Sequence, residues 1–175
     1  MKKGNGQVVT VDPNGDLEQR FVNFTDFIPR YFTSSAVAIQ GVKPGENVDF
    51  TTMWTVLGFP LTSVVVPLWL CMGENQPSVV LLDKNGVAPM CDKAIRLKAQ
   101  LFPITRTYGE NYLNINALYN VNNSGIMQKL KPIEDRIFDT AFKKLDAWRG
   151  NNNFKQQIPE LYRFINQTIL NEYIK

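Results

Sequence analysis

The first part of the chain alternates between short apolar segments and turns. Residues 35–40 form a short apolar segment, residues 51–57 are rich in β-branched and aromatic side chains, and residues 63–71 are apolar at nearly every position. Each segment fits a β-strand, and the unbroken apolar run of the third predicts a strand buried on both faces. Because proline has no N–H for a sheet ladder, Pro67 within that run indicates a bulge or an edge position. Residues 79–82 fit either a further short strand or the start of a helix.

A hairpin is predicted at the start of the chain. Residues 7–11 and 17–21 flank Asp12-Pro13-Asn14-Gly15. The proline presets φ and the Asn-Gly pair supplies left-handed backbone positions, which is the composition of a hairpin turn. The aromatic side chains of residues 23–31 are expected to pack over the edge of the sheet.

Helical periodicity dominates the rest of the chain. Residues 93–102, 124–149 and 158–174 place apolar side chains at helical spacing. Pro132 predicts a start or a kink in the second helix, and Pro159 fits the first turn of the third. The side chains expected to face the core are Ala94, Leu97, Ala99 and Leu101, then Ile126, Leu130, Ile133, Ile137, Phe138, Ala141, Leu145 and Trp148, then Leu161, Phe164, Ile165, Ile169 and Tyr173.

The order of these elements predicts the fold class. Strands occupy about residues 7–82 and helices about residues 92–174, with residues 150–153 joining the last two helices. Strands first and helices last is typical of an α+β protein built from two layers. A length of 175 residues fits one domain spanning residues 1–175.

Composition excludes several function classes. Histidine is absent, which removes Ser-His-Asp and Cys-His catalytic sets and histidine-ligated metal sites. The net charge is only +3, and basic residues alternate with acidic ones, so we expect neither nucleic acid nor a membrane surface as a partner. No apolar run is long enough to span a bilayer. We expect no metal and no cofactor.

The remaining reactive groups are two cysteines and a few carboxylates. Cys71 ends an apolar run, so we expect a buried, unreactive thiol there. Cys91 precedes the helix predicted from residue 93, where a helix N-terminus could stabilise a thiolate, and it is the candidate for a reactive thiol. A disulfide between the two is open if the compartment is oxidising. Glu134 and Asp135 share one helix but point away from each other, and we expect both to be solvated.

The two strongest strand predictions form a pair with a distinctive composition. Trp54 and Trp69 give each strand a large buried anchor, and residues 58–60 supply a Gly and a Pro for the turn. Thr62 and Ser63 open the second strand with two hydroxyls. These either bond to the backbone of the turn or, with Trp54, face a substrate pocket.

This strand pair resembles one found late in N-terminal-nucleophile (Ntn) hydrolases. Residues 51–69 read TTMWTVLGFPLTSVVVPLW, similar to the pattern T-x-W…L-G-x-P-x-T-S-V-x-x-P-x-W of the acyl-coenzyme A:6-aminopenicillanate acyltransferase and carcinine-hydrolase-like family. Residues 97–103 and 112–114, and the helix through Ile133 and Glu134, are similar in kind to the tail of bacterial members. The resemblance covers roughly residues 12–175.

The resemblance implies the C-terminal part of an αββα sandwich without its catalytic residue. Members of that family expose a Cys at a chain terminus, whose α-amine acts as the base for its own thiol. The start Met1-Lys2-Lys3 departs from that pattern, and neither Cys71 nor Cys91 has the expected context, so we assign no catalytic residue.

Two functions therefore remain open from the sequence. The chain is either the framework or a subunit of an amide hydrolase or acyltransferase, or a stand-alone binding or assembly module. The expected partner is a second copy of this chain or a separate chain carrying the nucleophile. No signal peptide is predicted, because no apolar segment follows Lys3, and the resemblance implies that related intact proteins are periplasmic or secreted.

Overall fold

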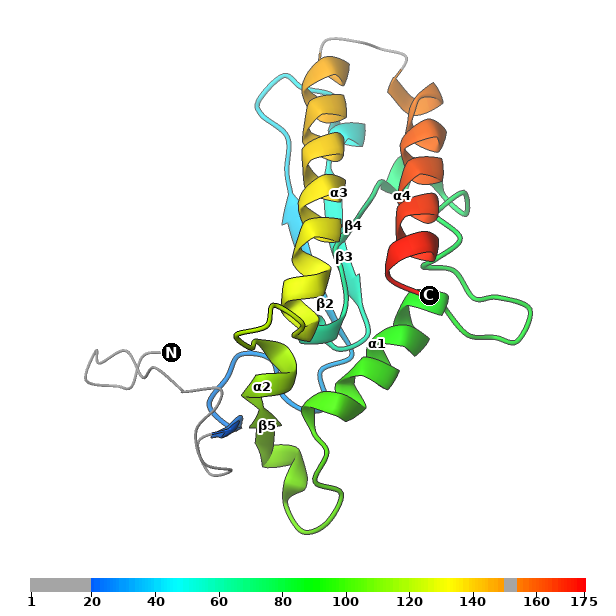
Figure 1. The fold of residues 1–175 in the computed structure, drawn as a ribbon. Coiled ribbons are helices and arrows are strands. Elements are labelled where there is room, and N and C mark those ends of the chain that lie inside the picture. The colour runs from blue at the N-terminus through cyan, green and yellow to red at the C-terminus, as the bar shows by residue number, and fades with distance from the viewer. Residues whose placement is uncertain (1–19, 150–153) are drawn as a thin grey trace.

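The structure, a computed structural model, describes residues 20–149 and 154–175 (Figure 1). Most of the predicted hairpin, up to residue 19, lies outside the described residues, and so does the connection at residues 150–153. The described residues form an α+β fold in which most of the strands come first and the long helices come last. The predicted fold class is confirmed at this level.

A three-stranded antiparallel sheet is the centre of the fold. It contains β2 (Ser35–Gln40), β3 (Thr52–Leu57) and β4 (Val66–Leu68) in the order β2-β3-β4. The first two match their predicted ranges almost residue for residue. The third does not, because only the middle of the predicted strand at residues 63–71 is paired with β3.

The β4 segment is buried as predicted but much shorter as a strand. Val64 to Trp69 are buried on both sides, whereas Leu70 is 80% exposed and opens a 3-10 turn, Leu70–Met72. Pro67 lies opposite Trp54 on a strand at the edge of the sheet, as expected from its missing N–H. Residues 79–82 form neither a strand nor a helix, but turns and a bend.

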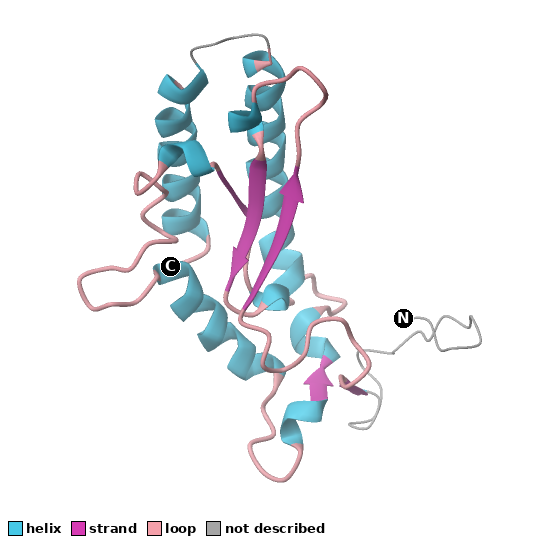
Figure 2. Ribbon diagram, turned by 180° about the vertical axis from the view of Figure 1, so that it is seen from behind, coloured by secondary structure: helices cyan, strands magenta, loops and turns pink. Residues whose placement is uncertain are grey.

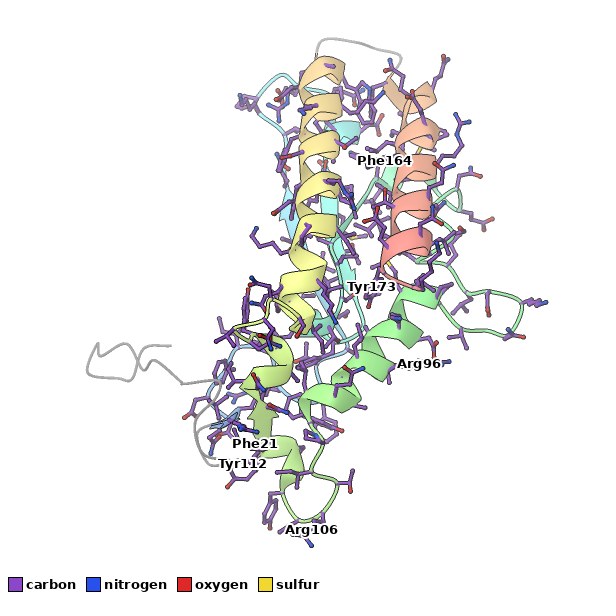
Figure 3. The ribbon with its side chains drawn as sticks, viewed as in Figure 1. Phe21, Arg96, Arg106, Tyr112, Phe164 and Tyr173 are labelled. Atoms are coloured by element: carbon purple, nitrogen blue, oxygen red, sulfur yellow. The ribbon has the colours of Figure 1, made fainter. Side chains whose placement is uncertain are left out.

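Two further strands make a separate small ribbon. The strand β1 (Phe21–Asn23) pairs antiparallel with β5 (Tyr112–Asn114), and Figure 3 shows Phe21 and Tyr112 close together there. Phe24, next to this ribbon, packs against Phe59 and Phe102, with ring centroids 5.9 and 5.3 Å away. The aromatic residues at 23–31 therefore pack where β3 and the first helix end.

In the part of the chain that the structure describes, the α-helices are α1 (Pro89–Leu101), α2 (Ile115–Leu118), α3 (Ile126–Trp148) and α4 (Ile158–Glu172). Short 3-10 turns occur at Val48–Phe50, Pro60–Thr62, Gly109–Asn111 and Phe154–Gln156. The α1 helix begins four residues earlier than predicted because Pro89 occupies its first turn, a position that needs no N–H. Pro159 lies in the first turn of α4, as predicted. Pro132 lies inside α3, which begins at Ile126, so the helix does not start at this proline.

The two long helices cover the β3 and β4 part of the sheet on one face and leave Ala36 and Ala38 of β2 exposed there. Figure 1 shows α3 in front of the strands with α4 beside it. Seen from behind, β2 and β3 lie in front of α3 (Figure 2). Seven of the eight α3 side chains expected in the core are buried, and Phe138 is partly buried. The long helices thus pack on the three-stranded sheet, and the β1–β5 ribbon forms a second, smaller sheet.

A glycine fixes how closely α1 approaches β3. Gly58, directly after β3, has a φ of +81°, and a Cβ placed on it would lie 2.4 Å from the Cβ of Ala94. Any larger residue at 58 would collide with α1, so the sequence uses the residue that has no side chain and tolerates positive φ.

Candidate functional site

Trp54 is fixed by structural contacts. Its ring is 7% exposed and packs in a tilted arrangement against Phe138 and Phe142 of α3, with centroids 4.9 and 5.1 Å away. Its indole N–H donates to Oε1 of Gln40 on the neighbouring strand at 2.9 Å. The prediction of a buried anchor is confirmed, and the indole N–H already has a partner.

The Thr62 hydroxyl bonds to backbone groups. It is fully buried and donates to the carbonyl oxygens of Phe59, at 3.1 Å, and Ala94, at 2.8 Å. The first bond closes the turn and the second ties that turn to α1. This is the turn-capping alternative of the sequence reading, extended by a contact with a helix.

The Ser63 hydroxyl lies in a buried polar site beside Tyr173. It makes no hydrogen bond with any residue that the structure describes. The Tyr173 phenol donates to the Thr62 carbonyl at 2.8 Å. Burial raises the pKa of Tyr173, and the neighbouring Ser63 hydroxyl opposes that rise. Neither of the two cavities described below is lined by Trp54, Thr62 or Ser63. Their substrate-pocket role stays a prediction.

The two cysteines are separate free thiols, so the disulfide left open by the sequence is not formed in this structure. Burial raises the pKa of the Cys71 thiol, and the nearby Asp49 adds to that effect, in keeping with an unreactive group. Cys91 lies inside the first turn of α1 rather than before it, and it is partly buried. Its reactive role stays a prediction.

Glu134 was expected to be solvated, and that expectation is wrong. Its carboxylate reaches from α3 to the chain just before β4 and accepts a hydrogen bond from the Val65 N–H at 3.1 Å. Burial raises the pKa of Glu134, while the bond from Val65 opposes the rise. Asp135 behaves as expected: it is exposed and pairs with Lys131 at 2.7 Å. Glu134, in a polar part of the sequence, thus has a hydrogen-bond partner 69 positions away along the chain.

At the other end of β4, the Tyr162 side chain also accepts a hydrogen bond from a backbone N–H. The Trp69 N–H donates to the Tyr162 hydroxyl of α4 at 3.1 Å, and that hydroxyl donates to Gln76 Oε1 at 2.9 Å. The Gln76 amide donates in turn to the Trp69 carbonyl at 3.1 Å. Both polar backbone groups of Trp69 are therefore satisfied by side chains. The sequence pattern predicts this bonding to the backbone for neither Tyr162 nor Gln76.

Among the described residues, no side chain bonds to the backbone at the opposite edge of the sheet. Residues 35–39 of β2 are exposed, including Val37 at 52% and Ile39 at 71%. In the register of the sheet, Val37 pairs with Thr55 and Ile39 with Met53, whereas Ala38 pairs with Trp54. Since Trp54 faces α3, Val37 and Ile39 lie on the other face, where the β2 part of the sheet is exposed, whereas Thr55, Val66 and Leu68 of the same face are buried. We call the exposed β2 part of this face, with Val37 and Ile39, the bare face.

A groove of about 430 Å³ lies where α1, α3 and the end of α4 meet. Its apolar lining includes Leu97, Ile126 and Leu130. Its charged lining consists of Lys93, Lys129, Lys175 and Glu172, and the Glu172 carboxylate is paired with Arg136. The Lys93 ammonium donates to the carbonyls of Ile174 and Lys175, at 3.3 and 3.0 Å. Figure 3 labels Tyr173, which also lines this groove, beside the junction of α4 and α1. An apolar wall with ammonium groups suits an anion that carries a hydrocarbon chain.

A smaller cavity of about 310 Å³ lies beside the β1–β5 ribbon, lined by Phe24, Tyr31, Arg30 and Glu110 among others. Within residues 20–149 and 154–175, no three Cys, Asp or Glu side chains gather in a way that could hold a metal ion. Over the same residues, no helix has the length and apolar character needed to cross a membrane.

Comparison with known proteins adds no relative to this picture. No family model matches the sequence, and no match is found among curated proteins or among solved structures.

Proposed function

We propose that this chain is the framework portion of an Ntn-type amide hydrolase or acyltransferase, whose nucleophile is supplied by a separate chain. The observation that carries the proposal is an apolar patch on the face of the sheet that points away from α3, where Val37 and Ile39 of β2 are exposed. Further along the same face, Thr55, Val66 and Leu68 are already buried. In an αββα sandwich each sheet has helices on one face and the second sheet on the other. Helices on one side of the sheet and an exposed apolar patch on the other support the proposal that a second sheet packs there.

The bare face has the chemistry that a second sheet would bury. Val37 and Ile39 are apolar, β-branched and more than half exposed, and Met53 beside them is partly buried. Stacked sheets pack about 10 Å apart through interdigitated apolar side chains. Such a partner would remove these side chains from water, and each fully buried aliphatic side chain contributes about 1.5–3 kcal/mol.

The contacts of the strand pair support a framework role. Trp54, Thr62 and Trp69 all use their polar groups or rings to hold strands, turns and helices together. The chain has no histidine, which agrees with a mechanism in which a terminal amine activates its own thiol.

The test is reconstitution. Purified alone, the chain should hydrolyse neither amide nor thioester test substrates. Native mass spectrometry of the protein from its source should show it with a second chain that begins with Cys, and the two together should show turnover that is lost when that Cys is changed to Ala. Turnover by the isolated chain that survives Cys71→Ala with Cys91→Ala would refute the proposal.

The groove between α1, α3 and α4 favours a second candidate function, a stand-alone binding module for amphipathic carboxylates. Dodecanoate below its micellar range is a suitable probe, and a dodecyl trimethylammonium ion is its matched control of opposite charge. Saturable binding of dodecanoate alone, weakened several-fold by Lys129→Gln and unchanged by Lys143→Gln on the same helix, would support it. Equal binding of both amphiphiles would rule it out.

A further inference from the structure

The outer edge of β2 is a second open feature of the sheet, distinct from the bare face. The strand order β2-β3-β4 places β2 at the end of the sheet, with no further strand beside it in the described part of the chain. Residues 35–39 are exposed on both faces. Edge strands of this kind are templates for pairing with another chain.

The register shows which backbone groups point outward. Gly58 N–H donates to the Ser34 carbonyl at 2.9 Å, so this opposed pair is hydrogen bonded, and hydrogen-bonded pairs alternate along an antiparallel ladder. Ala36, Ala38 and Gln40 therefore bond to β3. The N–H and C=O groups of Ser35, Val37 and Ile39 point away from the sheet, and within the described residues none of them makes a hydrogen bond.

The same alternation explains why the other edge is closed. Along the β4 segment, the backbone N–H and C=O groups of Val65, Pro67 and Trp69 point away from β3, with no N–H on the proline. The Glu134 carboxylate accepts a hydrogen bond from the Val65 N–H, and Pro67 has no N–H. The Trp69 N–H donates to the Tyr162 hydroxyl, and the Trp69 carbonyl accepts from the Gln76 amide. One edge of the sheet is blocked by side chains of the long helices and by a proline, and the other is left with free donors and acceptors.

We propose that β2 is a dimerisation edge and that its partner is β2 of a second copy of this chain, paired antiparallel about a two-fold axis at Val37. In that register Val37 of one copy lies opposite Val37 of the other, and Ser35 lies opposite Ile39. Each of these three opposed pairs exchanges two hydrogen bonds. When β2 runs antiparallel to its own copy, each outward N–H of one strand faces an outward C=O of the other.

The sequence around the edge removes the usual obstacles to self-pairing. Residues 32–42 contain no charged side chain and no proline, although the chain as a whole carries a net charge of +3. Like charges opposite one another would oppose the pairing, and edge lysines or prolines are the devices that prevent it. The Val37 and Ile39 side chains of both copies would lie on one continuous bare face.

The closed edge fixes the size of the assembly. Pairing through β2 gives a six-stranded sheet with a β4 strand at each end. Because each β4 edge is blocked, the sheet cannot grow further, and the contact produces a closed two-fold dimer rather than a filament. The inference goes beyond the proposed function and does not rest on it, because it concerns the edge of the sheet and not the bare face.

Multi-angle light scattering tests the dimer. Across about 1–100 µM, where association should depend on concentration, we expect a mass that approaches twice the 20.0 kDa of the chain. Val37→Lys places like charges opposite each other at the axis and should return the mass to 20.0 kDa over that range. Leu170→Lys on α4, which adds the same charge in place of an exposed aliphatic side chain, should leave the dimer intact.

Cysteine crosslinking tests the register. In a Cys71→Ser, Cys91→Ser background, Val37→Cys should oxidise to a disulfide-linked dimer, because opposed hydrogen-bonded residues lie about 5.5 Å apart between Cα atoms, within disulfide range. Ala38→Cys is the matched control: in this register it faces Ala36 of the other copy and should not crosslink.

The outcomes are decisive for the edge and separate from those for the hydrolase proposal. A chain that stays monomeric at the highest concentration, or a dimer that survives Val37→Lys, overturns the inference. Equal crosslinking at positions 37 and 38 overturns the register. Reconstitution with a chain that begins with Cys succeeds or fails independently of either result.

Discussion

Replacing Gly58 with alanine tests how the sheet is seated on α1. Two costs combine there. The residue has a φ of +81°, and an L-residue with a side chain loses about 1–2 kcal/mol in the left-handed region. The new methyl group would also lie 2.4 Å from the Ala94 Cβ, and overpacking of this kind costs about 1–3 kcal/mol. We expect Gly58→Ala to lower the free energy of unfolding by about 2–5 kcal/mol.

Gly45→Ala is the matched control. Gly45 has nearly the same φ, +85°, but nothing lies within 4 Å of its absent Cβ, so only the backbone cost of about 1–2 kcal/mol applies. The difference between the two variants isolates the contact with α1. Urea denaturation at fixed protein concentration measures it, provided that the slope of unfolding is unchanged.

A double-mutant cycle completes the test. Ala94→Gly alone should cost about 1 kcal/mol through helix propensity and a similar amount through the lost buried methyl group. Combined with Gly58→Ala, it removes the collision, so the two changes should cost about 1–3 kcal/mol less than their sum. If Gly58→Ala is no worse than Gly45→Ala, or if the two changes are additive, the close approach of α1 to β3 does not exist.

Three further predictions concern the strand pair and its closed edge. Trp54→Ala and Trp69→Ala should each cost about 3–5 kcal/mol, and a melting temperature within a degree or two of the parent would contradict the burial of that side chain. Tyr162→Phe leaves the buried Trp69 N–H without an acceptor and should cost about 1–3 kcal/mol by urea denaturation, whereas a neutral change would mean that water replaces the hydroxyl. Burial raises the pKa of Glu134 in the folded state, so the native protein holds this proton more tightly. Stability is therefore lost as pH rises from 4.5, the ordinary pKa of a glutamate side chain, through the folded pKa. Glu134→Gln should therefore match the parent below pH 4.5 and gain on it above, and parallel curves of urea midpoint against pH would refute that assignment.

The elements that were predictable from sequence are those whose pattern lies within one segment. The β2 and β3 strands have β-branched residues bounded by turn residues, and α3 and α4 repeat their apolar positions over several turns, so local chemistry is enough. The three-residue strands β1 and β5 carry no such pattern. Their pairing joins residues about 90 positions apart, and periodicity holds no information on that contact.

The end of the predicted third strand shows the same limit. Residues 63–71 are apolar throughout, and such a run predicts burial without predicting which neighbour satisfies the backbone. The predicted burial is confirmed, but the backbone N–H groups of Val65 and Trp69 donate to side chains of α3 and α4 instead of to a neighbouring strand. Glu134 was misjudged for the matching reason: nothing in a polar helical surface distinguishes a carboxylate that will meet a distant N–H from one that stays in water.

The closed edge of β4 also has a consequence for biosynthesis. The groups that satisfy Val65 and Trp69 lie 69 and 93 residues further along the chain. At a synthesis rate of about 5–20 residues per second, Tyr162 is added roughly 5–20 s after Trp69. During that interval both edges of the nascent sheet are open and its longest apolar run is uncovered. We therefore expect ribosome-bound chains that stop before α4 to depend on chaperones, and chains released after it to fold without them.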